Sequence, residues 1–109
     1  MKAYLIDVGI LLSKNDEEFE SYAIVYDKKY GYYDEDQFYL PKKEEAMNYA
    51  KTYVKDGVDN TYAVISLTEL PDDFDFTNCE LGSEYYLLND VVYSVAKINE
   101  KIMENFIEI

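Results

Sequence analysis

The 109-residue sequence contains no histidine, no arginine and only one cysteine, and these absences exclude most catalytic chemistry. Ser-His and Cys-His catalysis are excluded because both need an imidazole base. One cysteine without histidine forms neither a structural zinc site nor an internal disulfide bond, and a lone thiol suits a reducing compartment. No arginine is available to bind phosphate through two parallel hydrogen bonds. We therefore expect no enzyme activity, no cofactor or metal site, and a cytoplasmic location.

Long apolar runs are also missing. The longest uncharged apolar stretch is residues 8–12, whereas a membrane-spanning helix needs roughly 20 apolar residues. The first apolar segment contains Asp7 and lacks a small-residue cleavage pattern, so we expect no secretory signal. The four glycines are too scattered to form a phosphate-binding loop. The length predicts one domain over residues 1–109.

What the sequence has in excess is negative charge. It contains 23 acidic and 10 basic residues, all of the latter lysine, which gives a net charge of −13. An AT-rich genome favours lysine over arginine and enriches tyrosine, but the same bias does not explain the excess of acids. Because such a charge repels nucleic acid and anionic lipid, we expect a basic protein partner and no direct contact with nucleic acid or membranes.

The hydrophobic pattern predicts an α+β domain with a small antiparallel sheet of about four or five strands. Residues 2–12 are expected to form a central strand. Segments 20–27 and 32–40 alternate in polarity and are expected to form a hairpin, and residues 61–70 form a further strand that ends before Pro71. One helix over about 42–56 should cover this sheet.

The helix has the clearest local signals. Pro41 is expected at its first position and Gly57 at its C-cap, with Glu44 near the start and Lys55 near the end, where each charge complements the helix dipole. Its apolar residues recur at helical spacing and form one stripe: Ala46, Met47, Ala50, Tyr53 and Val54.

The last quarter of the chain fits two structures. Residues 85–88 are expected to form a strand, and residues 90–108 form either a helix or a hairpin. Five apolar residues fall on one helical face behind Asp90 as N-cap, and they narrowly favour the helix: Val91, Val95, Ile98, Ile102 and Phe106. The β-branched run 91–95 and the potential turn at Asn99-Glu100 favour the hairpin.

Two segments are candidate partner-binding surfaces because they combine aromatic and acidic residues. The first is 30–39, where tyrosines flank three consecutive acids. The second is 69–84, where six acids and two phenylalanines occur without a basic residue. The plainer alternatives are an edge strand protected by acids and a solvated loop with its phenylalanines packed in the core. The candidate binding residues are Tyr32, Tyr33, Asp34, Glu35, Asp36, Asp72, Asp73, Phe74 and Asp75.

In composition alone, the chain is similar to small acidic inhibitors that imitate the charge of DNA. The first hypothesis is therefore an inhibitor of a basic nucleic-acid-handling protein, such as a phage-encoded DNA mimic acting on a nuclease or a restriction or CRISPR effector. A second is an immunity protein or antitoxin that neutralises a basic toxin. A third is a non-catalytic accessory or structural module that forms a homodimer or larger homo-oligomer through tyrosine-rich strand edges.

Overall fold

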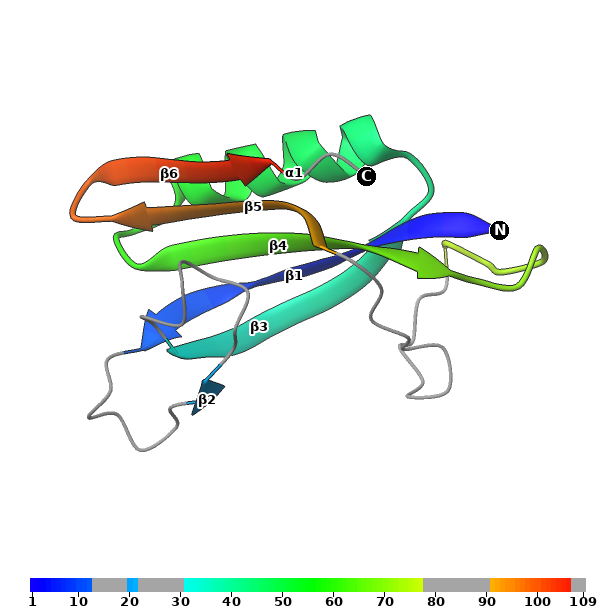
Figure 1. Cartoon of the computed structure of the whole chain (residues 1–109), viewed down its shortest axis with the longest axis horizontal. Coiled ribbons are helices and arrows are strands. Elements are labelled where there is room, and N and C mark those ends of the chain that lie inside the picture. Colours follow the sequence, from blue (N-terminus) through cyan, green and yellow to red (C-terminus); the bar gives the residue numbers. More distant parts are fainter. Residues whose placement is uncertain (13–19, 22–30, 78–90, 107–109) are drawn as a thin grey trace.

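The computed structural model describes residues 1–12, 20–21, 31–77 and 91–106. Its elements are β1 (Lys2–Leu12), β2 (Glu20–Ser21), β3 (Gly31–Leu40), α1 (Lys43–Asp56), β4 (Thr61–Glu69), β5 (Val91–Ile98) and β6 (Lys101–Phe106). The strands form one sheet in the order β2-β3-β1-β4-β5-β6, with antiparallel pairing throughout (Figure 1). The predicted α+β class is confirmed.

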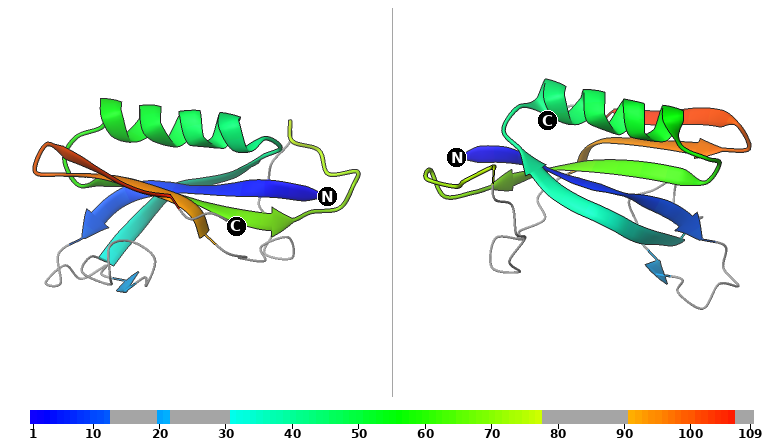
Figure 2. Two further views of the ribbon diagram at one scale, coloured as in Figure 1. Left: turned by 45° about the horizontal axis from the view of Figure 1, so that its top comes forward. Right: turned by 180° about the vertical axis from the view of Figure 1, so that it is seen from behind.

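Helix α1 covers one face of the sheet (Figure 2). Ala46, Ala50 and Val54 are completely buried against it, as the predicted apolar stripe requires. The helix begins at Lys43 with Lys42 as N-cap, so Pro41 precedes the helix and is not its first residue. Because no side chain caps this end, the first turn depends on the backbone bond from the Ala46 N–H to the Lys42 carbonyl. Gly57 is the C-cap, as predicted.

The central position predicted for β1 is confirmed, because β1 pairs with β3 on one side and β4 on the other. Both faces of this central sheet are buried. Opposite the helix, Ala3, Leu5 and Tyr39 pack with the partly buried Phe74 and Phe76. The packing of these two phenylalanines favours the plainer alternative for the segment 69–84, in which they belong to the core.

The C-terminal region is a hairpin, and the narrowly favoured helix is wrong. Strands β5 and β6 pair from Ile98↔Lys101 to Tyr93↔Phe106 around a turn at Asn99 and Glu100. Both turn residues have positive φ, 51° and 67°, which matches the two-residue turn that suits the twist of a hairpin. The apolar spacing misleads because β5 is buried on both faces, so alternation of polar and apolar residues is lost.

Two predicted strands fall wholly or partly outside the described residues. Nothing tests the strand expected at 85–88. Of the predicted strand 20–27, only Glu20 and Ser21 are described, and they pair antiparallel with Tyr32 and Gly31. In the part of the chain that the structure describes, no helix is long and apolar enough to cross a membrane.

Candidate functional site

A β-bulge in β3 places two adjacent carboxylates on the same side of the sheet. Val8 pairs with Asp36 and Gly9 pairs with Asp34, so Glu35 is an extra residue between them. Neighbouring side chains of a regular strand alternate between faces, but a bulge redirects one of them. Glu35 and Asp36 thus both lie on the helix side of the sheet. There Glu35 accepts a hydrogen bond from Tyr53, and the charge of Asp36 affects the pKa of Tyr49.

Tyr53 joins the helix to this bulge. Its hydroxyl donates a hydrogen bond to Oε2 of Glu35 over 3.1 Å. Partial burial of the phenol, followed by the hydrogen bond and charge of Glu35, raises the pKa of Tyr53 to about 12. Tyr53 is therefore protonated at physiological pH, and its hydroxyl holds the Glu35 carboxylate against the helix.

Tyr49 lies one helical turn before Tyr53 and extends the aromatic surface. The two rings are stacked, with centroids 6.3 Å apart and an interplanar angle of 20°. Phe38 meets Tyr49 edge to face at 4.6 Å, which fixes the ring from the β3 side. Burial raises the pKa of Tyr49, and the charge of Asp36 adds to this effect. Tyr49 nevertheless remains 38% exposed and accessible to a partner.

These groups border an open groove with a volume of about 450 Å³. We call it the acidic groove. It lies between the C-terminal half of α1, strands β1 and β3 and the start of β4. Its lining residues are Ile10, Glu35, Tyr49, Thr52, Tyr53, Asp56, Gly57, Val58 and Thr61. None of them is basic. At its rim, Nζ of Lys97 donates a hydrogen bond to the Gly57 carbonyl over 2.9 Å, so this lysine is occupied by the helix end.

The second predicted patch lies near the amino terminus. The Met1 amino group is 3.0 Å from Oδ1 of Asp72 and 3.3 Å from Oε1 of Glu69, so its positive charge compensates part of this patch. Asp75 accepts hydrogen bonds from the hydroxyl and the N–H of Thr77, at 2.6 and 2.9 Å, and these bonds lower its pKa. Asp73 is exposed.

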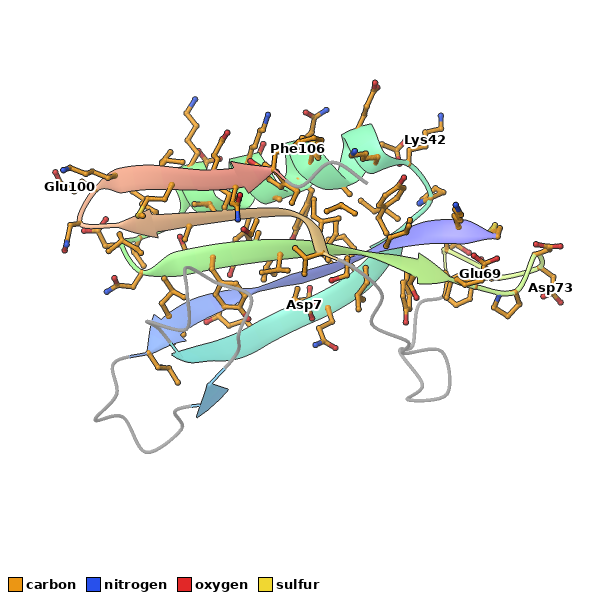
Figure 3. All side chains as sticks on the ribbon, viewed as in Figure 1. Asp7, Lys42, Glu69, Asp73, Glu100 and Phe106 are labelled. Carbon is orange, nitrogen blue, oxygen red and sulfur yellow. The ribbon has the colours of Figure 1, made fainter. Side chains whose placement is uncertain are left out.

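The structure does not bring the two predicted patches together. Asp34 pairs with Gly9, whereas Glu69, the first residue of the second patch, pairs with Lys2 seven positions away along β1. At about 3.3 Å per residue, the separation is roughly 23 Å. Figure 3 shows Glu69 and Asp73 near one end of the sheet, and Glu100, in the turn between β5 and β6, at the other end. A partner that contacts both patches must span the long axis of the molecule.

Of the residues that line the acidic groove, only Glu35 was among the predicted binding residues. The predicted Asp36 lies next to Glu35 and influences Tyr49 without lining the groove. The backbones of Tyr32, Tyr33 and Asp34 continue the same strand beside β1, and their side chains lie outside the described set. The helical half was missed, because Tyr53 was assigned only to the core stripe. The available signal was Tyr49, Tyr53 and Asp56, which recur at intervals of four and three and therefore share one helical face.

Comparison with protein-family models, curated proteins and solved structures gave no match. The acidic groove must therefore be interpreted from its own chemistry. Among the described residues, no group of three or more acidic or cysteine side chains is arranged to hold a metal ion. The groove instead offers carboxylates beside aromatic rings, and this combination suits an organic cation: carboxylates accept charge-assisted hydrogen bonds, and ring faces attract positive charge.

Proposed function

We propose that this protein is a non-catalytic inhibitor that acts in the cytoplasm by binding a basic, nucleic-acid-handling protein, and that the acidic groove receives lysine or arginine side chains of that partner. The observation that supports this proposal is the lining of the groove, where Glu35 and Asp56 lie beside Tyr49 and Tyr53 and no basic residue is among the described lining residues. A guanidinium or ammonium group entering the groove meets carboxylates and ring faces together.

The class of partner follows from charge. Channels that hold nucleic acid are lined with lysine and arginine, because they must neutralise phosphates. A chain with a net charge of −13 is attracted to such a channel and competes there with nucleic acid. Glu69 and Asp73 lie at the other end of the sheet (Figure 3), where the Met1 amino group compensates part of the negative charge. The acids that remain there support a partner surface that is positive along its length, as a nucleic-acid channel is. Restriction and CRISPR effectors, which a phage must disable, belong to this class of partner.

The test is capture of partners from the lysate of the protein's own host, at low and high salt. Wild type should retain a basic nucleic-acid-binding protein at low salt, release it at high salt, and inhibit its activity on DNA or RNA. The double variant Glu35→Gln/Asp56→Asn should lose capture. Its matched control is Glu44→Gln/Glu45→Gln, which removes the same charge from exposed positions in the first turn of α1 and should retain capture.

Two results would contradict the proposal. Equal capture by the groove variant and the control would show that the acidic groove is not the binding surface. Retention of a basic toxin without nucleic-acid-handling activity would instead identify an immunity protein or antitoxin, which uses the same charge attraction against another class of partner. The location of the gene beside a toxin gene would support that outcome.

A further inference from the structure

Strand β6 forms an open edge of the sheet. It is the last strand in the sheet order, and in Figure 1 it lies outermost, beyond β5. All six of its residues are exposed. Among them Ile102, Met103 and Phe106 are 48%, 40% and 47% exposed, so three large apolar side chains lie on one short strand. An edge of this kind is a template for pairing with another strand.

The turn determines which backbone groups point outward. A two-residue hairpin closes on a hydrogen-bonded pair, here Ile98 and Lys101, and the pairs then alternate along the strands. The N–H and C=O groups of Lys101, Met103 and Asn105 therefore face β5. Those of Ile102, Glu104 and Phe106 face away from the sheet, where a further strand can bond to them.

Charge distinguishes β6 from the other edge. The hairpin segment 97–106 contains two lysines and two glutamates, so it is neutral, and the net charge of −13 resides elsewhere in the chain. Lys43 adds a positive group, with Nζ 4.5 Å from the ring centre of Phe106. At the other end of the sheet order, the two-residue strand β2 pairs, among the described residues, only with Gly31 and Tyr32 of β3, and the three consecutive acids that follow in β3 would oppose a second copy. Repulsion between like copies is therefore weakest at β6.

We propose that β6 pairs with β6 of a second copy of this chain, antiparallel and about a twofold axis normal to the sheet, so that two sheets become one. This symmetry pairs residues whose side chains lie on the same face. A register centred on Glu104 would place two carboxylates directly opposite each other, which is destabilising. A register centred on Met103 pairs Met103 with Met103 of the second copy and Ile102 with its Glu104, and places no like charges directly opposite.

Sedimentation of the full chain from micromolar to near-millimolar concentration tests the dimer. Wild type should change from monomer to dimer. Glu104→Pro removes an N–H that faces away from β5, so the monomer should stay folded by circular dichroism while the dimer is lost. The matched control Glu104→Gln removes the same charge, retains the N–H and should dimerise at least as well as wild type. A wild type that is monomeric throughout, or a Glu104→Pro variant that is folded and still dimeric, would overturn the proposal.

Cross-linking tests the register. Met103 of two copies would form a non-hydrogen-bonded pair with Cα atoms about 4.5 Å apart, which is within the range for a disulfide bond. In a Cys79→Ser background, Met103→Cys should give a covalent dimer on mild oxidation, whereas Thr52→Cys, on the exposed surface of α1, should not. Equal cross-linking at both positions would show random collision and contradict the pairing.

The effect of salt distinguishes dimerisation through β6 from the proposed binding of a basic partner. Salt should strengthen the dimer, because it screens repulsion between two acidic copies, whereas it should weaken binding of a basic partner. The Glu35→Gln/Asp56→Asn variant should dimerise like wild type, because the described residues that line the acidic groove come from β1, β3, β4, α1 and the segment after α1, and none comes from β6. If one of the two proposals fails, the other can therefore still be tested.

Discussion

At the scale of single residues, Tyr53 determines how the acidic groove responds to pH. Its pKa in the folded state, about 12, lies above the value of about 10 expected in the unfolded chain. The neutral phenol is favoured by folding, so its contribution to the free energy of unfolding is complete below pH 10. It is lost as the pH rises from about 10 to about 12.

We therefore expect the stability advantage of wild type over Tyr53→Phe to shrink between about pH 9 and about pH 12. Chemical denaturation at both pH values measures this difference, and subtraction removes the effect of the other tyrosines. Glu35→Gln should lower the pKa of Tyr53, as followed by tyrosinate absorbance, because the negative acceptor is lost. A stability difference between wild type and Tyr53→Phe that stays constant from about pH 9 to about pH 12 would contradict the raised pKa of Tyr53.

Asp75 offers a second residue-scale test. The hydroxyl and N–H of Thr77 hold its pKa below the ordinary value, the hydroxyl contributing more. Thr77→Val removes the hydroxyl bond and keeps the shape, so the Asp75 pKa should rise part of the way back, whereas Thr77→Ser should leave it low. Carboxyl titration by NMR measures both variants. An identical Asp75 pKa in Thr77→Val and wild type would exclude the hydroxyl as the cause.

The limit of sequence reasoning is also visible at single residues. Glu35 and Asp36 were identifiable as acids beside tyrosines. The sequence did not indicate that both carboxylates lie on the helix side of the sheet, because in a regular strand neighbouring side chains point to opposite faces. The bulge exists only in the pairing of β3 with β1, from which Glu35 is left out. No local pattern in residues 30–39 encodes that pairing.

At the scale of elements, the end of α1 packs closely on the start of β4 at Gly57. A Cβ atom added to Gly57 would lie 2.9 Å from Cγ2 of Thr61 and 3.0 Å from the carbonyl oxygen of Tyr53. The φ of Gly57 is −77°, so alanine adopts this backbone without strain and would by itself gain about 0.4–1 kcal/mol. The steric conflict of the added Cβ opposes this gain in stability. Its cost should exceed the gain, because one of the two contacted atoms belongs to the backbone and cannot move aside easily.

We expect Gly57→Ala to lower the free energy of unfolding by about 1 kcal/mol, within the range for overpacking. Thr61→Ser, which removes Cγ2, should recover part of this loss when combined with Gly57→Ala. Urea denaturation of the single and double variants measures the coupling. A stabilised Gly57→Ala would show that the neighbouring atoms move apart at little cost.

Elements differed in how well the sequence predicted them. Helix α1 combined an apolar stripe with charges suited to its ends, and these signals are local, so its bounds were nearly correct. The sequence did not decide between a helix and a hairpin for the region 90–108, because the burial of both faces of β5 depends on the tertiary structure. Once alternation is lost, Val91, Val95 and Ile98 fit a helical face by coincidence. The positive φ of Asn99 and Glu100 distinguishes the two structures only when the fold is known.

For the whole molecule, the net charge of −13 makes stability depend on ionic strength. Like charges repel one another more in the compact state than in the extended chain, and salt screens this repulsion over a Debye length of about 10 Å at 0.1 M. The melting temperature should therefore rise as sodium chloride increases from low to physiological concentration. Calorimetry at constant protein concentration measures this, since dimerisation also affects melting. A melting temperature that falls with salt would show that favourable ion pairs outweigh the repulsion.

The central position of β1 also has a consequence for how the chain reaches its native state. Ile6 pairs with Ile65, so the middle of the sheet closes only after more than half of the chain is available. Pairings between residues so distant in sequence slow folding, and mixed α/β topologies of this kind fold more slowly than helical bundles. During synthesis, the first strand leaves the ribosome long before its β4 neighbour exists. Strand β3 can pair with one edge of β1 earlier, but the edge that receives β4 must remain unpaired until then. Residues 1–60 contain 13 acids and 8 lysines, and the resulting net charge of −5 opposes association of emerging chains through this edge.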